Sequence, residues 1–217
     1  IYYERVDSIP YRSRVFKLDR MRDLLARLGH PHHHVRVVHI AGTKGKGSTA
    51  AMVASVLDAA GYRTGLFTSP HLERIEERFV VAGQTCSESE FVDMVAQVER
   101  VVSKMDSEAV ASSAAETGPT YFEIATAIAL LYFCQGEVDL AVMEVGLGGR
   151  LDSTNVCLPV VTAITSISLD HTTQLGNTLG EIAAEKSGII KPNVPVVSGV
   201  RDNVAGSVIE KTARHWG

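Results

Sequence analysis

The residues best suited to chemistry lie in a glycine-rich turn between an apolar run and a helical segment. The turn reads Gly42-Thr43-Lys44-Gly45-Lys46-Gly47-Ser48-Thr49. Its three glycines fall within six residues, which lets backbone N–H groups turn inward around an anion. The Lys46 ammonium adds a positive charge, and a helix over Ala50–Leu57 points its positive end at the same place. We therefore predict a phosphate-binding loop, with the Ser48 hydroxyl in reach of a magnesium ion.

The order of residues departs from the usual phosphate-loop pattern. That pattern is G-x-x-x-x-G-K-[ST], whereas this chain has G-x-x-G-K-G-S, with Gly47 between Lys46 and Ser48. An apolar strand precedes the turn at Val37–Ile40, and a helix follows it. A lysine and two hydroxyls at the mouth of such a turn favour a phosphate site over a purely structural turn.

Three further polar residues follow predicted strands. Ser69, Glu144 and His171 lie just past the carboxyl ends of apolar runs, so they should meet Ser48 in one crevice. A buried carboxylate such as Glu144 costs about 2–5 kcal/mol without a cation or donors, and magnesium would satisfy it. Other interpretations remain open, because Ser69 could cap a turn and His171 could be a hydrogen-bonded core histidine. Lys186, on a predicted helix, would ordinarily be a solvated surface charge.

Strands and helices alternate along the chain and should position these residues. We expect an irregular arm over residues 1–17, then a helix at 18–28, a strand at 37–40, a helix at 50–57, a strand at 62–68, a hairpin at 78–86, a helix from 87 to about 105, a loop at 106–118, a helix at 120–135, strands at 138–145 and 160–167, a helix at 179–186, a strand at 194–197 and a helix at 205–214. The hairpin should turn at Ala82-Gly83, and Ser87 with Glu90 makes a capping box. This alternation predicts an α/β fold, a doubly wound, mainly parallel sheet with helices on both faces.

Four histidines lie close together after the first predicted helix. They are His30, His32, His33 and His34. Ligands this close in sequence rarely surround one ion, so we favour a solvated loop over a metal site here.

Composition limits the function classes. At 217 residues, with 45% apolar and 21% charged residues, the chain can bury a core as one globular domain. Its net charge of −4 gives no reason to expect nucleic acid, and no stretch is apolar enough to span a membrane. Cys86, Cys134 and Cys157 are scattered, as expected for reduced thiols of a cytoplasmic protein. We expect a cytoplasmic monomer, and the start at Ile1 suggests a trimmed sequence.

Several further motifs accompany the glycine-rich turn. They are Thr68-Ser69-Pro70-His71-Leu72, Thr120-Tyr121-Phe122-Glu123, Glu144-Val145-Gly146-Leu147-Gly148-Gly149-Arg150-Leu151-Asp152-Ser153-Thr154-Asn155, Ser168-Leu169-Asp170-His171 and Glu185-Lys186-Ser187-Gly188-Ile189. In this order, the motifs resemble those of folylpolyglutamate synthases and dihydrofolate synthases, which belong to the Mur ligase superfamily. The resemblance extends from about Tyr11 to Val200. The Glu144–Asn155 block separates this branch from the cell-wall Mur ligases.

The resemblance implies a phosphate-loop fold of the Mur ligase central-domain type and a role for each matching residue. The ATP phosphates would be held by the loop, Gly42, Thr43, Lys44, Gly45, Lys46, Gly47, Ser48 and Thr49. A first Mg²⁺ would be bound by Ser48, Ser69 and Glu144, and a second by Glu144, His171 and Lys186. Lys186 would carry a carbamate, because a desolvated lysine can have its pKa lowered enough to react with carbon dioxide. Thr120, Phe122 and Asp152 match positions that contact the pterin of the folate substrate.

The reaction implied is ATP-driven amide formation. A folate or dihydropteroate carboxylate attacks the γ-phosphate to give an acyl phosphate, and the amine of L-glutamate then displaces phosphate. Lys46, Glu144, His171 and Lys186 would be the catalytic residues, acting by positioning and charge neutralisation.

Two other function classes stay open. The chain could be another phosphate-loop NTPase or Mur-type ligase, against which the Glu144–Asn155 block argues, or a nucleotide-binding module without turnover. Relatives of this kind carry a second, C-terminal domain that binds glutamate. We expect residues 1–217 to be the ATP-binding domain, with the glutamate-ligase domain absent from this chain.

Overall fold

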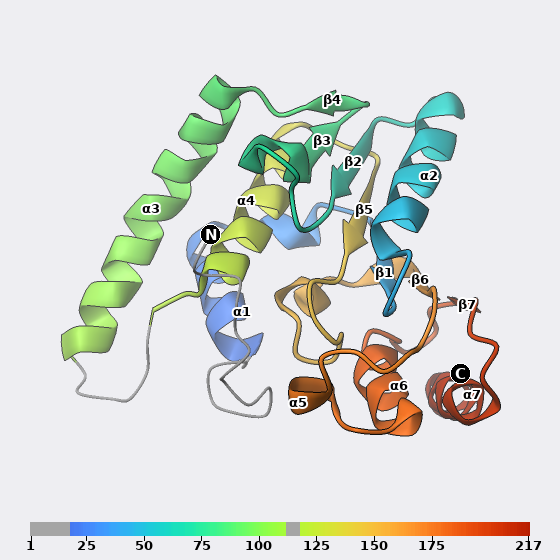
Figure 1. The fold of residues 1–217 in the computed structure, drawn as a ribbon. Helices are drawn as coiled ribbons and strands as arrows, with labels where there is room; N and C mark the ends of the chain where they lie inside the picture. Colours follow the sequence, from blue (N-terminus) through green and yellow to red (C-terminus); the bar gives the residue numbers. More distant parts are fainter. Residues whose placement is uncertain (1–17, 112–117) are drawn as a thin grey trace.

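A seven-stranded sheet organises the part of the chain that the structure, a computed structural model, describes, residues 18–111 and 118–217 (Figure 1). The sheet has the order β4-β3-β2-β5-β1-β6-β7. Its strands are β1 (Val37–Ala41), β2 (Thr64–Phe67), β3 (Phe79–Val81), β4 (Gln84–Thr85), β5 (Leu140–Glu144), β6 (Pro159–Ile164) and β7 (Val196–Ser198). The strands β2, β5, β1, β6 and β7 run parallel, and β3 and β4 pair antiparallel at one edge. The expectation of a mainly parallel sheet is therefore confirmed.

Helices connect the strands. They are α1 (Leu18–Arg27), α2 (Lys46–Ala59), α3 (Glu88–Ala111), α4 (Tyr121–Gln135), α5 (Thr172–Leu175), α6 (Leu179–Ser187) and α7 (Asn203–Trp216), with short 3₁₀ turns η3 (Pro31–His33), η4 (Ile75–Arg78) and η5 (Ser153–Val156). Figure 1 shows α1, α3 and α4 on one side of the sheet and α2 on the other. Both faces are thus covered, as the strand and helix alternation predicts.

The two central strands are buried on both sides. Every residue of β1 and of β5 is buried. Val37 and Met143 point into the core cluster that α1, α3 and α4 cover, whereas Val38 and Val142 point into the cluster under α2. Because successive side chains of a strand face opposite sides, a continuous apolar run is what such a two-sided position requires.

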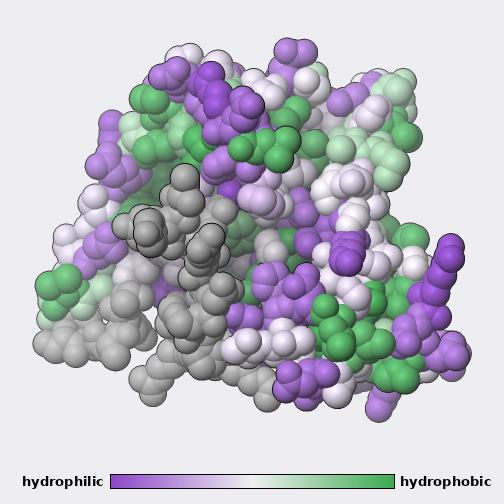
Figure 2. Space-filling view, viewed as in Figure 1, coloured by the Kyte–Doolittle hydropathy of each residue, from purple (hydrophilic) through white to green (hydrophobic). Residues whose placement is uncertain are grey.

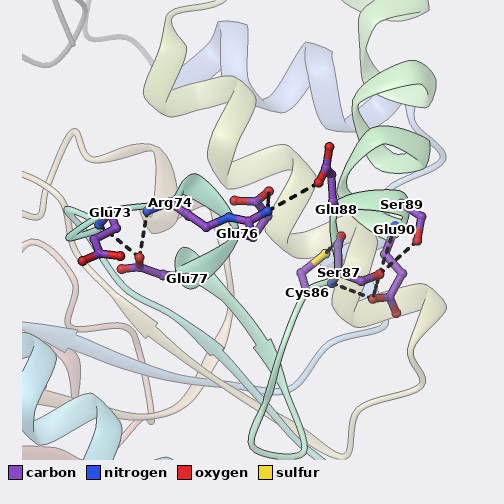
Figure 3. Close-up of polar contacts among 9 residues, drawn as sticks. All are labelled: Glu73, Arg74, Glu76, Glu77, Cys86, Ser87, Glu88, Ser89 and Glu90. Atoms are coloured by element: carbon purple, nitrogen blue, oxygen red, sulfur yellow. Dashed lines mark hydrogen bonds and ion pairs between the residues drawn. The ribbon is translucent and has the colours of Figure 1, made fainter.

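The hairpin and the capping box form where the sequence places them. Ala82 and Gly83 both have positive φ, 48° and 71°, as a tight two-residue hairpin turn needs. Ser87 Oγ and its backbone N–H both donate to the Glu90 carboxylate at 2.5 and 2.8 Å (Figure 3). These bonds satisfy donors at the start of α3.

Two expectations about element boundaries are wrong, and one short helix was not predicted. Helix α2 begins at Lys46 rather than Ala50, since Gly45 takes a left-handed conformation with φ 79° and starts the helix directly from the turn. The segment 106–111 is the last part of α3 rather than a loop, and an ion pair of 2.7 Å between Arg27 and Glu108 ties it to α1. The short helix α5 is not anticipated from the sequence. The expected arm over 1–17 and the rest of the expected loop, 112–117, lie outside the described residues.

Within the described ranges, no helix combines the length and the apolar character that crossing a bilayer requires. In the view of Figure 2, hydrophilic and hydrophobic residues are interspersed over the surface. The three cysteines are free thiols, and two of them are buried.

Candidate nucleotide and metal site

The glycine-rich turn leaves β1 at Gly42. This residue has φ 151°, and a Cβ on it would overlap the Thr165 hydroxyl oxygen. A side chain is therefore excluded both by the backbone conformation and by the close approach of the segment after β6.

That segment, residues 165–168, anchors the turn through hydroxyl groups. Thr43 Oγ1 donates to the Ser168 carbonyl at 3.3 Å and accepts from the Ser168 N–H at 3.1 Å. The Lys44 N–H donates to Ser166 Oγ at 3.0 Å, and Thr165 Oγ1 donates to the Lys44 carbonyl at 2.8 Å. Sequence reasoning gave Thr165 and Ser166 no role, although a hydroxyl-rich run directly after a strand is a usable signal.

The start of α2 supplies backbone N–H donors, one of which, that of Gly47, bonds to the Glu144 carboxylate. Its N-cap is Gly45, and no side chain caps the helix there. The first N–H groups of an α-helix have no intrahelical partner, and the helix dipole makes this end positive. Lys46, the first helical residue, adds its ammonium beside them. The geometry is that of an anion-binding helix start.

Glu144 ends β5 directly beneath this helix start. Glu144 is 4% exposed, and its Oε2 accepts from the Ser69 N–H at 3.0 Å. Lys46 Nζ lies 4.0 Å from Oε1, and a Cβ on Gly47 would sit 3.3 Å from Oε2. Burial raises the pKa of the Glu144 carboxyl, while the Ser69 N–H and Lys46 oppose that rise. The carboxylate is thus buried but incompletely neutralised.

The Glu144 carboxylate and the hydroxyls of Ser48 and Ser69 are oxygen donors of the kind that fits a magnesium ion. Ser48 is exposed in the first turn of α2, and Ser69 is half-buried. Carboxylate and hydroxyl oxygens are hard donors, which Mg²⁺ prefers. A bound Mg²⁺ would also balance the charge that burial disfavours at Glu144.

The segment after Ser69 is held by its own loop. The Glu77 carboxylate accepts the backbone N–H groups of Leu72, Glu73 and Arg74 at 2.9, 3.0 and 2.7 Å. Figure 3 shows Glu77 turned toward Glu73 and Arg74, with Arg74 also paired to Glu76 at 2.9 Å. These bonds fix the loop that presents Ser69 to Glu144.

Lys186 is buried, which corrects the ordinary expectation of a solvated lysine. The residue is 4% exposed, and its Nζ donates to the Gly42 carbonyl at 2.8 Å. Burial, reinforced by the charge of Lys46, lowers the pKa of Lys186 to about 8, while Asp170 and Asp152 oppose the change. Helix α6 therefore delivers a partly neutral amine to the base of the phosphate loop.

The Glu144–Asn155 block holds α6 in this place. The Arg150 guanidinium pairs with the Glu185 carboxylate at 2.9 Å, and the Arg150 N–H donates to the Glu185 carbonyl at 2.8 Å. Asn155 Nδ2 donates to the Gly188 carbonyl at 3.1 Å. Residues flanking Lys186 are thus fixed by the block that follows β5.

His171 is the N-cap residue of α5. Its φ is 47°, and its side chain is 51% exposed, with Nε2 at 3.9 Å from Asp170 Oδ1. Among the described residues, no hydrogen bond or ion pair joins His171 to Glu144. The structure therefore brings Lys46, Ser69 and Glu144 together and places Lys186 at Gly42, but His171 makes no such contact, and its role as a ligand stays a prediction.

The three residues matched to the pterin site have structural contacts of their own. Thr120 caps α4, because its Oγ1 accepts the Glu123 N–H at 3.3 Å, and the same hydroxyl donates to the Glu123 carboxylate at 2.8 Å. The Phe122 ring packs on the backbone of Gly146. Asp152 is 5% exposed and accepts the Leu147 N–H at 2.9 Å and the Thr154 N–H at 3.0 Å. Burial raises the pKa of the Asp152 carboxyl.

The fold and the loop geometry define an α/β protein of the phosphate-loop class. Residues 40–216 match the family model of the Mur ligase middle domain. The chain therefore belongs to the Mur ligase superfamily, as the resemblance of its motifs predicts.

Curated relatives and solved structures agree with this membership. The chain is 48% identical over 201 residues to a dihydrofolate synthase/folylpolyglutamate synthase of Bacillus subtilis, covering 91% of this chain and 45% of that protein. The folylpolyglutamate synthase structure from Thermotoga maritima is 42% identical, with a TM-score of 0.84, covering 92% of this chain and 44% of the other. The structure of a complex named FPGS–AMPPCP–folate is 38% identical, with a TM-score of 0.88, and the match covers 97% of this chain and 50% of the other. The chain spans about half the length of the relatives it matches.

Proposed function

We propose that this chain is the ATP-binding part of a ligase that adds L-glutamate to the carboxylate of a folate or dihydropteroate. The observation that carries the proposal is the meeting of the Ser69 N–H and Lys46 on the buried Glu144 carboxylate. Support comes from relatives named dihydrofolate synthase/folylpolyglutamate synthase and from a similar structure that holds AMPPCP and folate.

The proposed reaction has two steps. A carboxylate oxygen of the substrate attacks the γ-phosphorus of ATP, the bond to the β-phosphate oxygen breaks, and ADP leaves. The glutamate amine then attacks the acyl carbon, loses a proton and displaces inorganic phosphate. Lys46 and the first N–H groups of α2 stabilise negative charge on the phosphate oxygens. Ser48, Ser69 and Glu144 would hold Mg²⁺, which supplies further neutralisation of the phosphates.

Lys186 is proposed to carry a carbamate. Its neutral nitrogen attacks carbon dioxide and loses a proton, so that a cation becomes an anionic group able to bind a metal. The lowered pKa of about 8 and the burial of Lys186 support this step. Carbon-13 NMR of the protein in ¹³C-bicarbonate would show a carbamate signal, and Lys186→Arg should lack it. A signal that survives in Lys186→Arg would contradict the assignment.

The substrate side of the proposal involves the α4 start and the loop after β5. Phe122 is half-buried beside Gly146 and offers an aromatic surface. Thr120, two residues before Phe122, and Asp152, in the loop that also contains Gly146, contribute polar atoms. We propose that these residues line the pterin position. Phe122→Leu keeps an apolar side chain but removes the ring, so it should weaken binding of pteroate and leave binding of AMPPCP unchanged.

A chimera tests the ligase function. Residues 18–216 would replace the matching segment of the Bacillus subtilis relative, and the product would be incubated with Mg·ATP, labelled glutamate and either dihydropteroate or tetrahydrofolate. We expect label in a folate product, and none when the chimera carries Lys46→Ala. A folded chimera that binds AMPPCP but forms no labelled product would overturn the proposed reaction.

A further inference from the structure

The connection between α1 and β1 brings three imidazole rings together. His30, His32 and His33 each offer a nitrogen, and these atoms all lie within 4.8 Å of one another. The ring centroids of His32 and His33 are 4.2 Å apart, those of His30 and His33 are 5.0 Å apart, and those of His30 and His32 are 5.9 Å apart. Proximity in sequence, which argues against a shared ion, is therefore overcome by the local backbone.

A tight turn produces this arrangement. Gly29 and His30 both have positive φ, 81° and 58°, and the buried Pro31 starts the 3₁₀ turn η3. The His33 N–H donates to the His30 carbonyl at 3.0 Å. This bond closes the turn, and the His30 and His33 rings stack with an interplanar angle of 4°.

A second observation points to a ligand. His32 Nδ1 is buried and has no hydrogen-bond partner, which is costly for a polar atom unless something binds it. A neutral imidazole ring offers a nitrogen lone pair that a metal can take.

We propose that His30, His32 and His33 form a surface site for a divalent late first-row ion of the Zn²⁺, Cu²⁺ and Ni²⁺ class. Imidazole nitrogens suit these ions, whereas Mg²⁺ prefers oxygen ligands. Three protein ligands leave a coordination position for water.

The site is independent of the nucleotide site. It precedes the amino end of β1, and the phosphate loop follows the carboxyl end, so a strand of five residues, about 17 Å long, separates them. A bound ion would fasten the α1–β1 connection and add stability by mass action.

The test is calorimetry of the untagged protein with ZnCl₂ and NiCl₂ in a non-chelating buffer, with MgCl₂ as the ion control. We expect one saturable site for ZnCl₂ and NiCl₂. His33→Gln and His30→Asn should weaken it roughly tenfold or more, because each removes a ring, and Asn tolerates the left-handed backbone at position 30. The matched control is His34→Gln, which changes an exposed neighbour outside the cluster and should bind as the unaltered protein does.

Two further readouts separate this site from other ligands. Electron paramagnetic resonance with one equivalent of Cu²⁺ should show coupling to imidazole nitrogens, which His33→Gln reduces. The melting temperature should rise with ZnCl₂ in the unaltered protein and in His34→Gln but not in His33→Gln. Absence of saturable binding, or equal binding in His33→Gln and His34→Gln, would overturn the proposal.

Discussion

The Ser69 N–H donates to Glu144 Oε2 at 3.0 Å across a sequence distance of 75 residues. This bond joins the loop after β2 to the end of β5, next to the first turn of α2. It therefore places one carboxylate where a metal and the phosphates of a nucleotide would meet, and substitutions around it separate binding roles from structural ones.

Glu144→Gln should weaken Mg²⁺-dependent nucleotide binding without weakening the fold. The amide keeps the size of the side chain and an oxygen that accepts the Ser69 N–H, but it removes a charge that burial disfavours. In the absence of Mg²⁺, the free energy of unfolding should stay within about 1 kcal/mol of the unaltered value. Calorimetry with AMPPCP, with and without MgCl₂, measures the binding effect. If MgCl₂ strengthens AMPPCP binding equally in both proteins, Glu144 is structural.

Lys46→Ala should abolish detectable AMPPCP binding, since the ammonium beside the start of α2 supplies the side-chain charge for the phosphates. The matched control is Lys44→Ala in the same turn. Lys44 is exposed and holds the loop through its backbone N–H and carbonyl, so its truncation should cost much less affinity. Equal losses in the two variants would remove the specific role of Lys46.

Thr43→Val should loosen the phosphate loop. The substitution keeps the shape but removes the hydroxyl that bonds to both backbone groups of Ser168, and the loss is about 1–3 kcal/mol of stability because those groups lose a partner. Chemical denaturation measures the stability, and calorimetry the expected drop in AMPPCP affinity. Thr43→Ser restores the hydroxyl and should recover both. Failure of Thr43→Ser to recover either quantity would show that the methyl group, not the hydroxyl, matters.

Lys186→Met should change how stability depends on pH. The pKa of Lys186 is about 8 in the folded chain and 10.5 without the fold, so between these values the unfolded chain binds a proton that the folded chain does not. The contribution of Lys186 to the free energy of unfolding therefore rises with pH between pH 8 and pH 10.5 and is lowest below pH 8. Removing the buried charge contributes about 3 kcal/mol at pH 7, and loss of the bond to the Gly42 carbonyl costs about 1–3 kcal/mol at every pH, so the net gain should be largest at pH 7 and should shrink by pH 10. Urea unfolding in carbon dioxide-free buffer checks this, and a gain that is independent of pH would refute it.

The local sequence was enough to predict the phosphate loop, the parallel sheet and the membership of the superfamily. Glycines at 42, 45 and 47 beside Lys46 predict a turn whose N–H groups can close around an anion. An apolar run such as Val37–Ala41 predicts a strand covered on both faces. The capping box at Ser87 also follows from neighbouring residues. The turn and the helix cap depend on contacts within a few residues along the chain, and the apolar run of a buried strand is likewise a local pattern, which the sequence displays directly.

Only the tertiary structure decided which groups share an environment. Lys186 becomes a buried amine because it meets the Gly42 carbonyl 144 residues away, and Lys44 is anchored by Ser166 across 122 residues. His171 belongs to one of the motifs that supply the expected ligands, but in the structure its exposed ring lies beside Asp170. His30, His32 and His33 come together through two consecutive left-handed residues, Gly29 and His30. Burial, charge and ring geometry depend on packing between distant segments or on backbone angles, and residue types alone do not fix either.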